Sequence, residues 1–251
     1  MEAGTFRMDQ ISDLASELRK GDHLFKADIQ DAYYHLRVRK VDKMRLAFYV
    51  GSRIYVPLCL NCGLAVAPWF FTKAMSPVVA WLRRLGHRVF AYLDDFFGAA
   101  KPGRPDTATG QKETVELGRV MPLLFAKLGL NLHPGKCFFS GSTRLELLGI
   151  LVDTEEERFL LSPKKLQPIE AGAARLLRYA SRHRRYVKRK DVERFAGLAN
   201  ASSPAVVDCR LRLRELFTAL SLSPVTPHLP QKPHTSSEIK VSRTRDVTRD
   251  A

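Results

Sequence analysis

Two spacings of apolar residues alternate along the first two thirds of the chain. Apolar residues recur every three or four positions, as on one face of a helix, in residues 8–20, 68–85 and 115–128. Short runs of apolar, aromatic and β-branched residues, which favour strands, occupy residues 23–28, 44–50, 53–58, 145–152 and 158–161. Gly51-Ser52 lies between two of these runs and predicts a hairpin turn. Helices mixed with antiparallel hairpins predict an α+β fold.

The pattern changes at Ser162. Ser162-Pro163 suits the N-cap and first position of a helix, and only helical spacing follows, in residues 164–180, 188–199 and 205–220. The final segment is rich in Pro, Ser, Thr and charge, so it is expected to be disordered. The expected divisions of the chain are residues 1–21, 22–161, 162–220 and 221–251.

Two adjacent carboxylates, Asp94 and Asp95, interrupt a long apolar stretch and predict a turn between two strands. Half-buried like charges so close resist joint ionisation, and a divalent cation removes that cost. Mg²⁺ binds carboxylate oxygens and substrate phosphates. A solvated hairpin turn explains the pair equally well, because Asp favours turns. A third acid, Asp28, ends another short apolar strand, and the three together favour a site for two metal ions.

The composition indicates a polyanionic partner. The 251 residues include 41 Lys and Arg against 26 Asp and Glu, a formal net charge of +15, and 45% apolar residues, enough for a core. Nucleic acid is the simplest such partner, and an acidic membrane surface is the alternative. No apolar span is long enough to cross a bilayer and no signal peptide is evident, so we expect an intracellular protein, cytoplasmic or nuclear, with no membrane partner.

The spacing of Cys59 and Cys62 allows a zinc site and hence a zinc-dependent regulatory module. A structural zinc site usually takes four ligands in two close pairs, and the other cysteines, Cys137 and Cys209, do not form a second pair. Reduced thiols are therefore the favoured interpretation.

Five segments, in a fixed order, resemble the motifs of reverse transcriptases. They are the Asp28 segment 25–34, the loop and helix start 60–71, the Tyr92-Leu93-Asp94-Asp95 turn, and residues 129–137 and 146–150. Residues 200–205 and 210–214 are similar to the segment after the palm in DIRS-like retrotransposons. The resemblance implies an RNA-directed DNA polymerase. Residues 1–21 would be a linker helix left from truncated fingers, 22–161 the palm with an antiparallel sheet, 162–220 an all-helical thumb and 221–251 a tail.

The resemblance also implies a mechanism and its residues. Two Mg²⁺ ions, with Mn²⁺ as the alternative, would drive addition of deoxynucleoside triphosphates to a primer on an RNA or DNA template. The implied roles are metal binding and catalysis by Asp28, Asp94 and Asp95, protonation of pyrophosphate by Lys136, nucleotide contact by Tyr33, Cys62, Gly63 and Tyr92, and primer grip by Leu148 and Gly149.

Some of these residues also have ordinary structural interpretations. The family places an aromatic residue five positions after the first Asp, where a ring excludes a ribose 2′-hydroxyl; Tyr33 fits, although one of Tyr33 and Tyr34 is expected in the core. Lys136 would otherwise be a surface lysine. Asp31 is expected to cap a helix start rather than to bind metal.

A strip of cations lies in the predicted thumb. Its members are Arg182, Arg184, Arg185, Lys188, Arg189 and Lys190. Such a single-sign run favours contact with phosphates over an ordinary solvated face.

The chain departs from the family at Asn61 and Cys62, where Pro and then Gln or Phe are common. Basic fingers residues are also expected to be lacking before the palm. These departures leave a second hypothesis, an inactive truncated remnant that binds nucleic acid.

Overall fold

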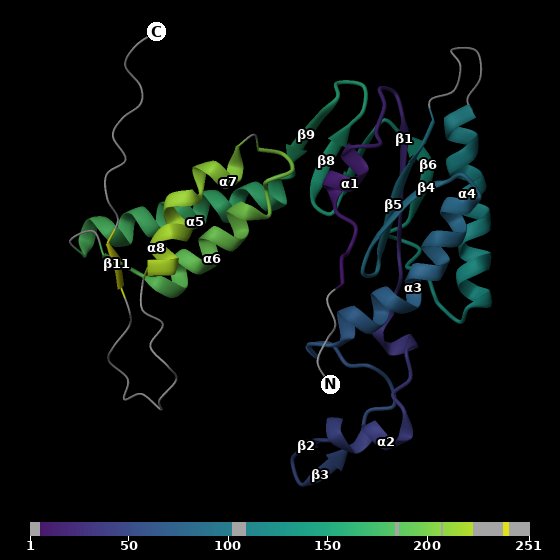
Figure 1. The fold of residues 1–251 in the computed structure, drawn as a ribbon, viewed down its shortest axis with the longest axis horizontal. Coiled ribbons are helices and arrows are strands. Elements are labelled where there is room, and N and C mark those ends of the chain that lie inside the picture. The colour runs from purple at the N-terminus through teal and green to yellow at the C-terminus, as the bar shows by residue number, and fades with distance from the viewer. Residues whose placement is uncertain (1–5, 102–108, 184–185, 207, 223–237, 241–251) are drawn as a thin grey trace. The chain divides into compact units, whose positions relative to one another are not determined.

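The computed structural model describes residues 6–101, 109–183, 186–206, 208–222 and 238–240 (Figure 1). The chain divides into two compact units, Met1–Arg158 and Phe159–Ala251, and each is described by itself. No helix in the described ranges combines the length and apolarity needed to cross a bilayer.

An antiparallel sheet of four strands, in the order β4-β5-β1-β6, forms the centre of the first unit. The strands are β1 (His23–Asp28), β4 (Arg88–Tyr92), β5 (Asp95–Ala100) and β6 (Phe138–Ser142). Strand β6 was not predicted, because the small residues Ser140, Gly141 and Ser142 hide its pattern. Gly98 allows the close packing of the sheet, since a Cβ there would lie 2.1 Å from the main-chain oxygen of Arg88.

Two long helices, α3 (Ala67–Arg84) and α4 (Thr109–Lys127), pack against this sheet (Figure 1). Their apolar residues pack with those of β1, β4 and β5 in one core, which includes Phe25, Ala27, Phe71, Met121 and Phe125. Side chains alternate along a strand, so Lys26 and Asp28 lie on the face of β1 opposite Phe25 and Ala27. The first acidic residue thus faces away from the helix-covered core.

The other elements of the first unit are short. They are α1 (Ile11–Ala15), η1 (Ala32–His35), α2 (Lys40–Lys43), η2 (Met44–Leu46), β2 (Phe48–Val50), β3 (Arg53–Tyr55), β7 (Arg144–Leu147) and β8 (Ile150–Asp153); β9 (Arg158–Leu161) contains the unit boundary. The hairpin at Gly51-Ser52 is confirmed by the pairing of β2 with β3.

The helix predicted over residues 8–20 forms only over Ile11–Ala15, so the prediction is wrong on both sides of this range. Buried Asp22 accepts a hydrogen bond from the main-chain N–H of Arg19 (2.8 Å), so this segment is held by a side chain instead of helical bonds.

The second unit contains α5 (Pro163–Arg182), β10 (Tyr186–Lys188), α6 (Arg189–Asn200), α7 (Cys209–Arg212), α8 (Arg214–Leu222) and β11 (Glu238–Lys240). Its core includes Ala180, Val187, Val192, Ala196 and Leu220. The prediction of helices alone is wrong, because β10 pairs with β11. The same pairing contradicts complete disorder after residue 221; residues 223–237 and 241–251 lie outside the described residues.

Candidate active site

The sheet brings the three acidic residues to one end. Asp28, the last residue of β1, is the cross-strand partner of Asp95, the first residue of β5. The main-chain N–H of Ile29 donates to the main-chain oxygen of Asp94 (2.9 Å), which continues the ladder into the turn. Residues remote in the sequence thus meet through strand pairing.

The turn that carries Asp94 is tight and strained. Tyr92 pairs with Asp95, so only Leu93 and Asp94 connect β4 to β5. Leu93 has φ of +56°, a left-handed conformation that a hairpin of this length usually gives to glycine. Such a conformation costs roughly 1–3 kcal/mol and persists only where the surroundings hold it. The paired strands on both sides hold this one and fix where Asp94 emerges.

Lys136 approaches Asp28 from the loop after α4. Its Nζ donates to the two carboxylate oxygens of Asp28 at 3.2 and 3.4 Å, although its side chain is 59% exposed. The loop is anchored because the N–H of His133 donates to the main-chain oxygen of Asp28 (2.8 Å). The hydrogen bond and charge of Asp28 raise the pKa of Lys136, so the ammonium form is favoured.

The other two carboxylates influence the titration of Asp95. Burial, followed by the charges of Asp94 and Asp28, raises the pKa of Asp95 to about 6, against the opposing effect of Lys136 and Lys26. Close carboxylates of this kind are hard oxygen ligands whose repulsion a divalent cation would relieve. The donor chemistry therefore fits Mg²⁺. Within the described ranges, however, no three or more Asp, Glu, His or Cys side chains are gathered tightly enough to hold an ion.

Tyr33 lies between the core and the acidic residues. Its ring packs edge-to-face on Phe71, with centroids 5.8 Å apart. Burial raises the pKa of Tyr33, and Asp94, Cys62 and Tyr92 add to that rise, so the ring also faces the site. Tyr34 is 52% exposed. The residue predicted to exclude a ribose 2′-hydroxyl is thus also the aromatic residue that packs on the core.

Asp31 occupies the N-cap position of η1, as predicted, but its side chain makes no capping hydrogen bond. Its main-chain oxygen instead accepts from the N–H of Tyr34 (2.8 Å), and its φ of +54° places it in the left-handed region.

Cys62 and Gly63 lie in the exposed loop before α3, and Gly63 has φ of +85°. The thiol of Cys62 raises the pKa of Tyr34, which places this loop beside η1. All four cysteines are free thiols.

Leu148 and Gly149 form the two-residue turn between β7 and β8, with φ of +48° and +74°. Positive φ at both positions is typical of a type I′ turn. The Nζ of Lys26 donates to the main-chain oxygen of Glu146 (3.3 Å) and so ties this hairpin to β1. Lys26 was missed by the sequence analysis; its position two residues before Asp28, on the same face, was the available signal.

The sequence analysis also missed a clamp on the edge strand β4. Asp9 Oδ2 accepts from the main-chain N–H of Ala91 (2.9 Å) and from Nη2 of Arg83 (2.7 Å). The Nε of Arg83 donates to the main-chain oxygen of Val89 (2.8 Å). The clamp therefore supports the strand that leads into the acidic turn, and no sequence motif marked it.

The basic strip is only partly a free surface. Arg182, Lys188 and Lys190 are exposed, and Nζ of Lys188 lies 5.8 Å from the ring centroid of Tyr179. Arg189, by contrast, is 17% exposed and donates to Glu193 (2.8 Å) and to the main-chain oxygen of Leu220 (2.7 Å). The guanidinium of Arg189 therefore makes hydrogen bonds within the second unit. Arg184 and Arg185 lie outside the described residues.

An antiparallel sheet with acidic residues paired at the strand ends indicates a polymerase-like class of protein. Comparison with known proteins identifies the family within this class. Residues 2–152 match the family described as "Reverse transcriptase (RNA-dependent DNA polymerase)". The chain belongs to this family, as its motifs predicted. The DIRS-like subtype stays a prediction.

The relatives are larger than this chain. Protein P of duck hepatitis B virus (strain China) is 23% identical over 219 residues, covering 84% of this chain and 25% of that protein. The foamy viral protease-reverse transcriptase bound to RNA/DNA hybrid superposes with a TM-score of 0.65 at 14% identity, covering 95% of this chain and 27% of that one. Its complex with dsDNA gives 0.62 at 15% identity, covering 96% and 43%. These likenesses confirm the predicted α+β polymerase fold.

Proposed function

We propose that this chain is an RNA-directed DNA polymerase domain that adds deoxynucleotides to a primer paired with an RNA or DNA template. The observation that carries the proposal is the cross-strand pairing of Asp28 with Asp95, with Asp94 in the turn beside them. Family membership and structurally similar proteins solved in complex with RNA/DNA hybrid and dsDNA support it. A retrotransposon source belongs to the same proposal and rests on the sequence resemblance.

Asp28, Asp94 and Asp95 would hold two Mg²⁺ ions, with Mn²⁺ as the alternative. Bound ions would lower the pKa of the primer hydroxyl and stabilise the charge on the triphosphate. Asp95 must give up its proton to serve as a ligand, and its pKa of about 6 permits this at neutral pH.

The remaining residues would position the reactants and move protons. The neighbouring carboxylate of Asp28 favours the protonated form of Lys136. Lys136 could donate this proton to the leaving pyrophosphate if its side chain moves away from Asp28 when the nucleotide binds. Tyr33, held by Phe71, would exclude a ribose 2′-hydroxyl. Cys62 and Gly63 would contact the incoming nucleotide, and the Leu148-Gly149 turn would grip the primer end.

Primer extension tests the proposal. The purified chain, with Mg²⁺ and deoxynucleotides, should lengthen a labelled primer on an RNA template and on a DNA template of the same sequence. Binding of both template-primers without any extension would contradict the proposal and support the second hypothesis, an inactive remnant that binds nucleic acid.

A further inference from the structure

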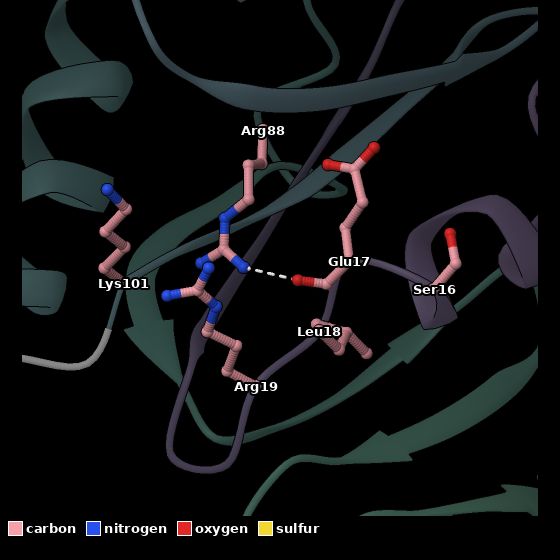
Figure 2. A pocket seen from close by; sticks show the side chains of 6 residues that line it. All are labelled: Ser16, Glu17, Leu18, Arg19, Arg88 and Lys101. Atoms are coloured by element: carbon pink, nitrogen blue, oxygen red, sulfur yellow. Dashed lines mark hydrogen bonds between the residues drawn. The ribbon is translucent and has the colours of Figure 1, made fainter.

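A second charged site lies in the first unit, away from the acidic residues. A pocket of about 310 Å³ is lined by Ser16, Glu17, Leu18, Arg19, Arg88 and Lys101 (Figure 2). Arg88 begins β4 and Tyr92 ends it, so the pocket lies about 13 Å along the strand from the acidic turn, at roughly 3.3 Å per residue. It is therefore distinct from the proposed polymerase centre.

Three cations from separate segments meet at this pocket. Figure 2 shows the guanidinium groups of Arg19 and Arg88 directed toward one another, while the side chain of Lys101 lies beside them and its amine end is directed away from them. The carboxylate of Glu17 is directed away from them, and only its main-chain oxygen accepts from Arg88 (2.8 Å). Like charges facing one another repel, and an anion between them would reverse that interaction.

Arg88 is fixed in place and still has an unused donor. Its Nη1 donates to Oδ2 of the fully buried Asp22 (2.6 Å), and its side chain is only 16% exposed. Its Nη2 is buried and has no hydrogen-bond partner, and Oδ1 of Asp22 in the same ion pair has none either. A buried donor without an acceptor is costly and calls for an explanation. Arg19 is exposed, so its long side chain can move and let a ligand oxygen reach Arg88.

We propose that this pocket binds a phosphate group. Guanidinium donors match the oxygens of phosphate in geometry and charge, and Lys101 adds a further charge. The phosphate can come from a free or terminal monoester or from the diester backbone of a nucleic acid strand, because both present the same oxygens.

The test replaces only the exposed cations and leaves the Arg88–Asp22 ion pair intact. Binding of radiolabelled inorganic phosphate is measured by equilibrium dialysis for the parent, for Arg19→Gln/Lys101→Gln, and for the control Lys112→Gln/Arg119→Gln, which removes two exposed cations from α4. The first variant should bind at least about tenfold more weakly, and the control should match the parent. Equal binding by both variants, or no binding by the parent, would overturn the proposal.

Competition then identifies the source of the phosphate. Displacement of the label by the diester thymidylyl-thymidine would assign the pocket to a nucleic acid strand, and displacement only by a nucleoside monophosphate would assign it to a monoester. Displacement by neither ligand would restrict the pocket to free inorganic phosphate. These measurements need no polymerase activity, so their failure would leave the polymerase proposal standing.

Discussion

Asp28 and Asp95 face one another across adjacent antiparallel strands, and the main-chain bond from Ile29 to Asp94 holds the third acid beside them. The site therefore depends on strand register as much as on residue identity. A shift of one residue in β1 would turn Asp28 toward the helix-covered core.

Asp94→Asn should abolish nucleotide incorporation and leave the fold intact. Loss of the carboxylate would weaken metal binding and stabilisation of transition-state charge, and one such contact is worth on the order of a hundredfold or more in rate. Single-nucleotide extension and thermal unfolding would measure the two properties. Asp31→Asn is the matched control, because Asn also tolerates the left-handed backbone of Asp31. Normal extension by Asp94→Asn, with an active parent, would contradict the assignment.

The contribution of Asp95 to the stability of the metal-free protein should be lost as the pH rises through about 6. The folded-state pKa of Asp95 is raised from 3.8 to about 6. The stability that Asp95 contributes is therefore fully present below about pH 4 and is lost as the pH rises from about 4 to about 6. Urea unfolding in EDTA measures the free energy of unfolding of both proteins. The value for Asp95→Asn, relative to the parent, should increase by on the order of 1 kcal/mol between pH 4 and pH 7, allowing for solvent screening. Excess Mg²⁺ at pH 7 should stabilise the parent more than the variant. Parallel pH curves for the two proteins would show that Asp95 is not strained by its neighbours.

Tyr33→Ala should let ribonucleotides compete with deoxynucleotides at least roughly tenfold better, the scale on which small steric differences discriminate substrates. Tyr33→Phe, which keeps the ring, and Tyr34→Ala, which removes an exposed ring, are the controls. The measurement is kcat/KM for each nucleotide. An unchanged preference in Tyr33→Ala would limit Tyr33 to its packing on Phe71.

Neutralising Arg182, Lys188 and Lys190 together should weaken binding to unrelated duplexes about equally. It should also flatten the slope of log affinity against log salt by up to about three units, roughly 0.9 per lost phosphate contact. Filter binding at several salt concentrations with two template-primers would measure this. The control neutralises three exposed cations of α4, Lys112, Arg119 and Lys127. If both triple variants keep the parent's slope, the strip is an ordinary solvated face.

The sequence alone determined the family, the α+β class and the order of the acidic motifs, because these follow from local spacing and residue chemistry. The hairpin at Gly51-Ser52 and the helix over residues 68–85 were predictable for the same reason. Local periodicity could not show β6, because its small residues hide the strand pattern, or β10 with its partner β11, because these short strands form through pairing with a remote segment.

The tertiary structure decided which groups act together. Contacts between segments far apart in the chain decide three of these features. They are the bond of Lys26 to the β7–β8 hairpin, the clamp of Asp9 and Arg83 on β4, and the hydrogen bonding of Arg189 within its own unit. Arg19, Arg88 and Lys101 likewise form a pocket only because β4 begins and β5 ends next to the segment after α1. Sequence spacing specifies faces and turns, but hydrogen bonds and charge interactions act across space, so the fold alone brings these residues together.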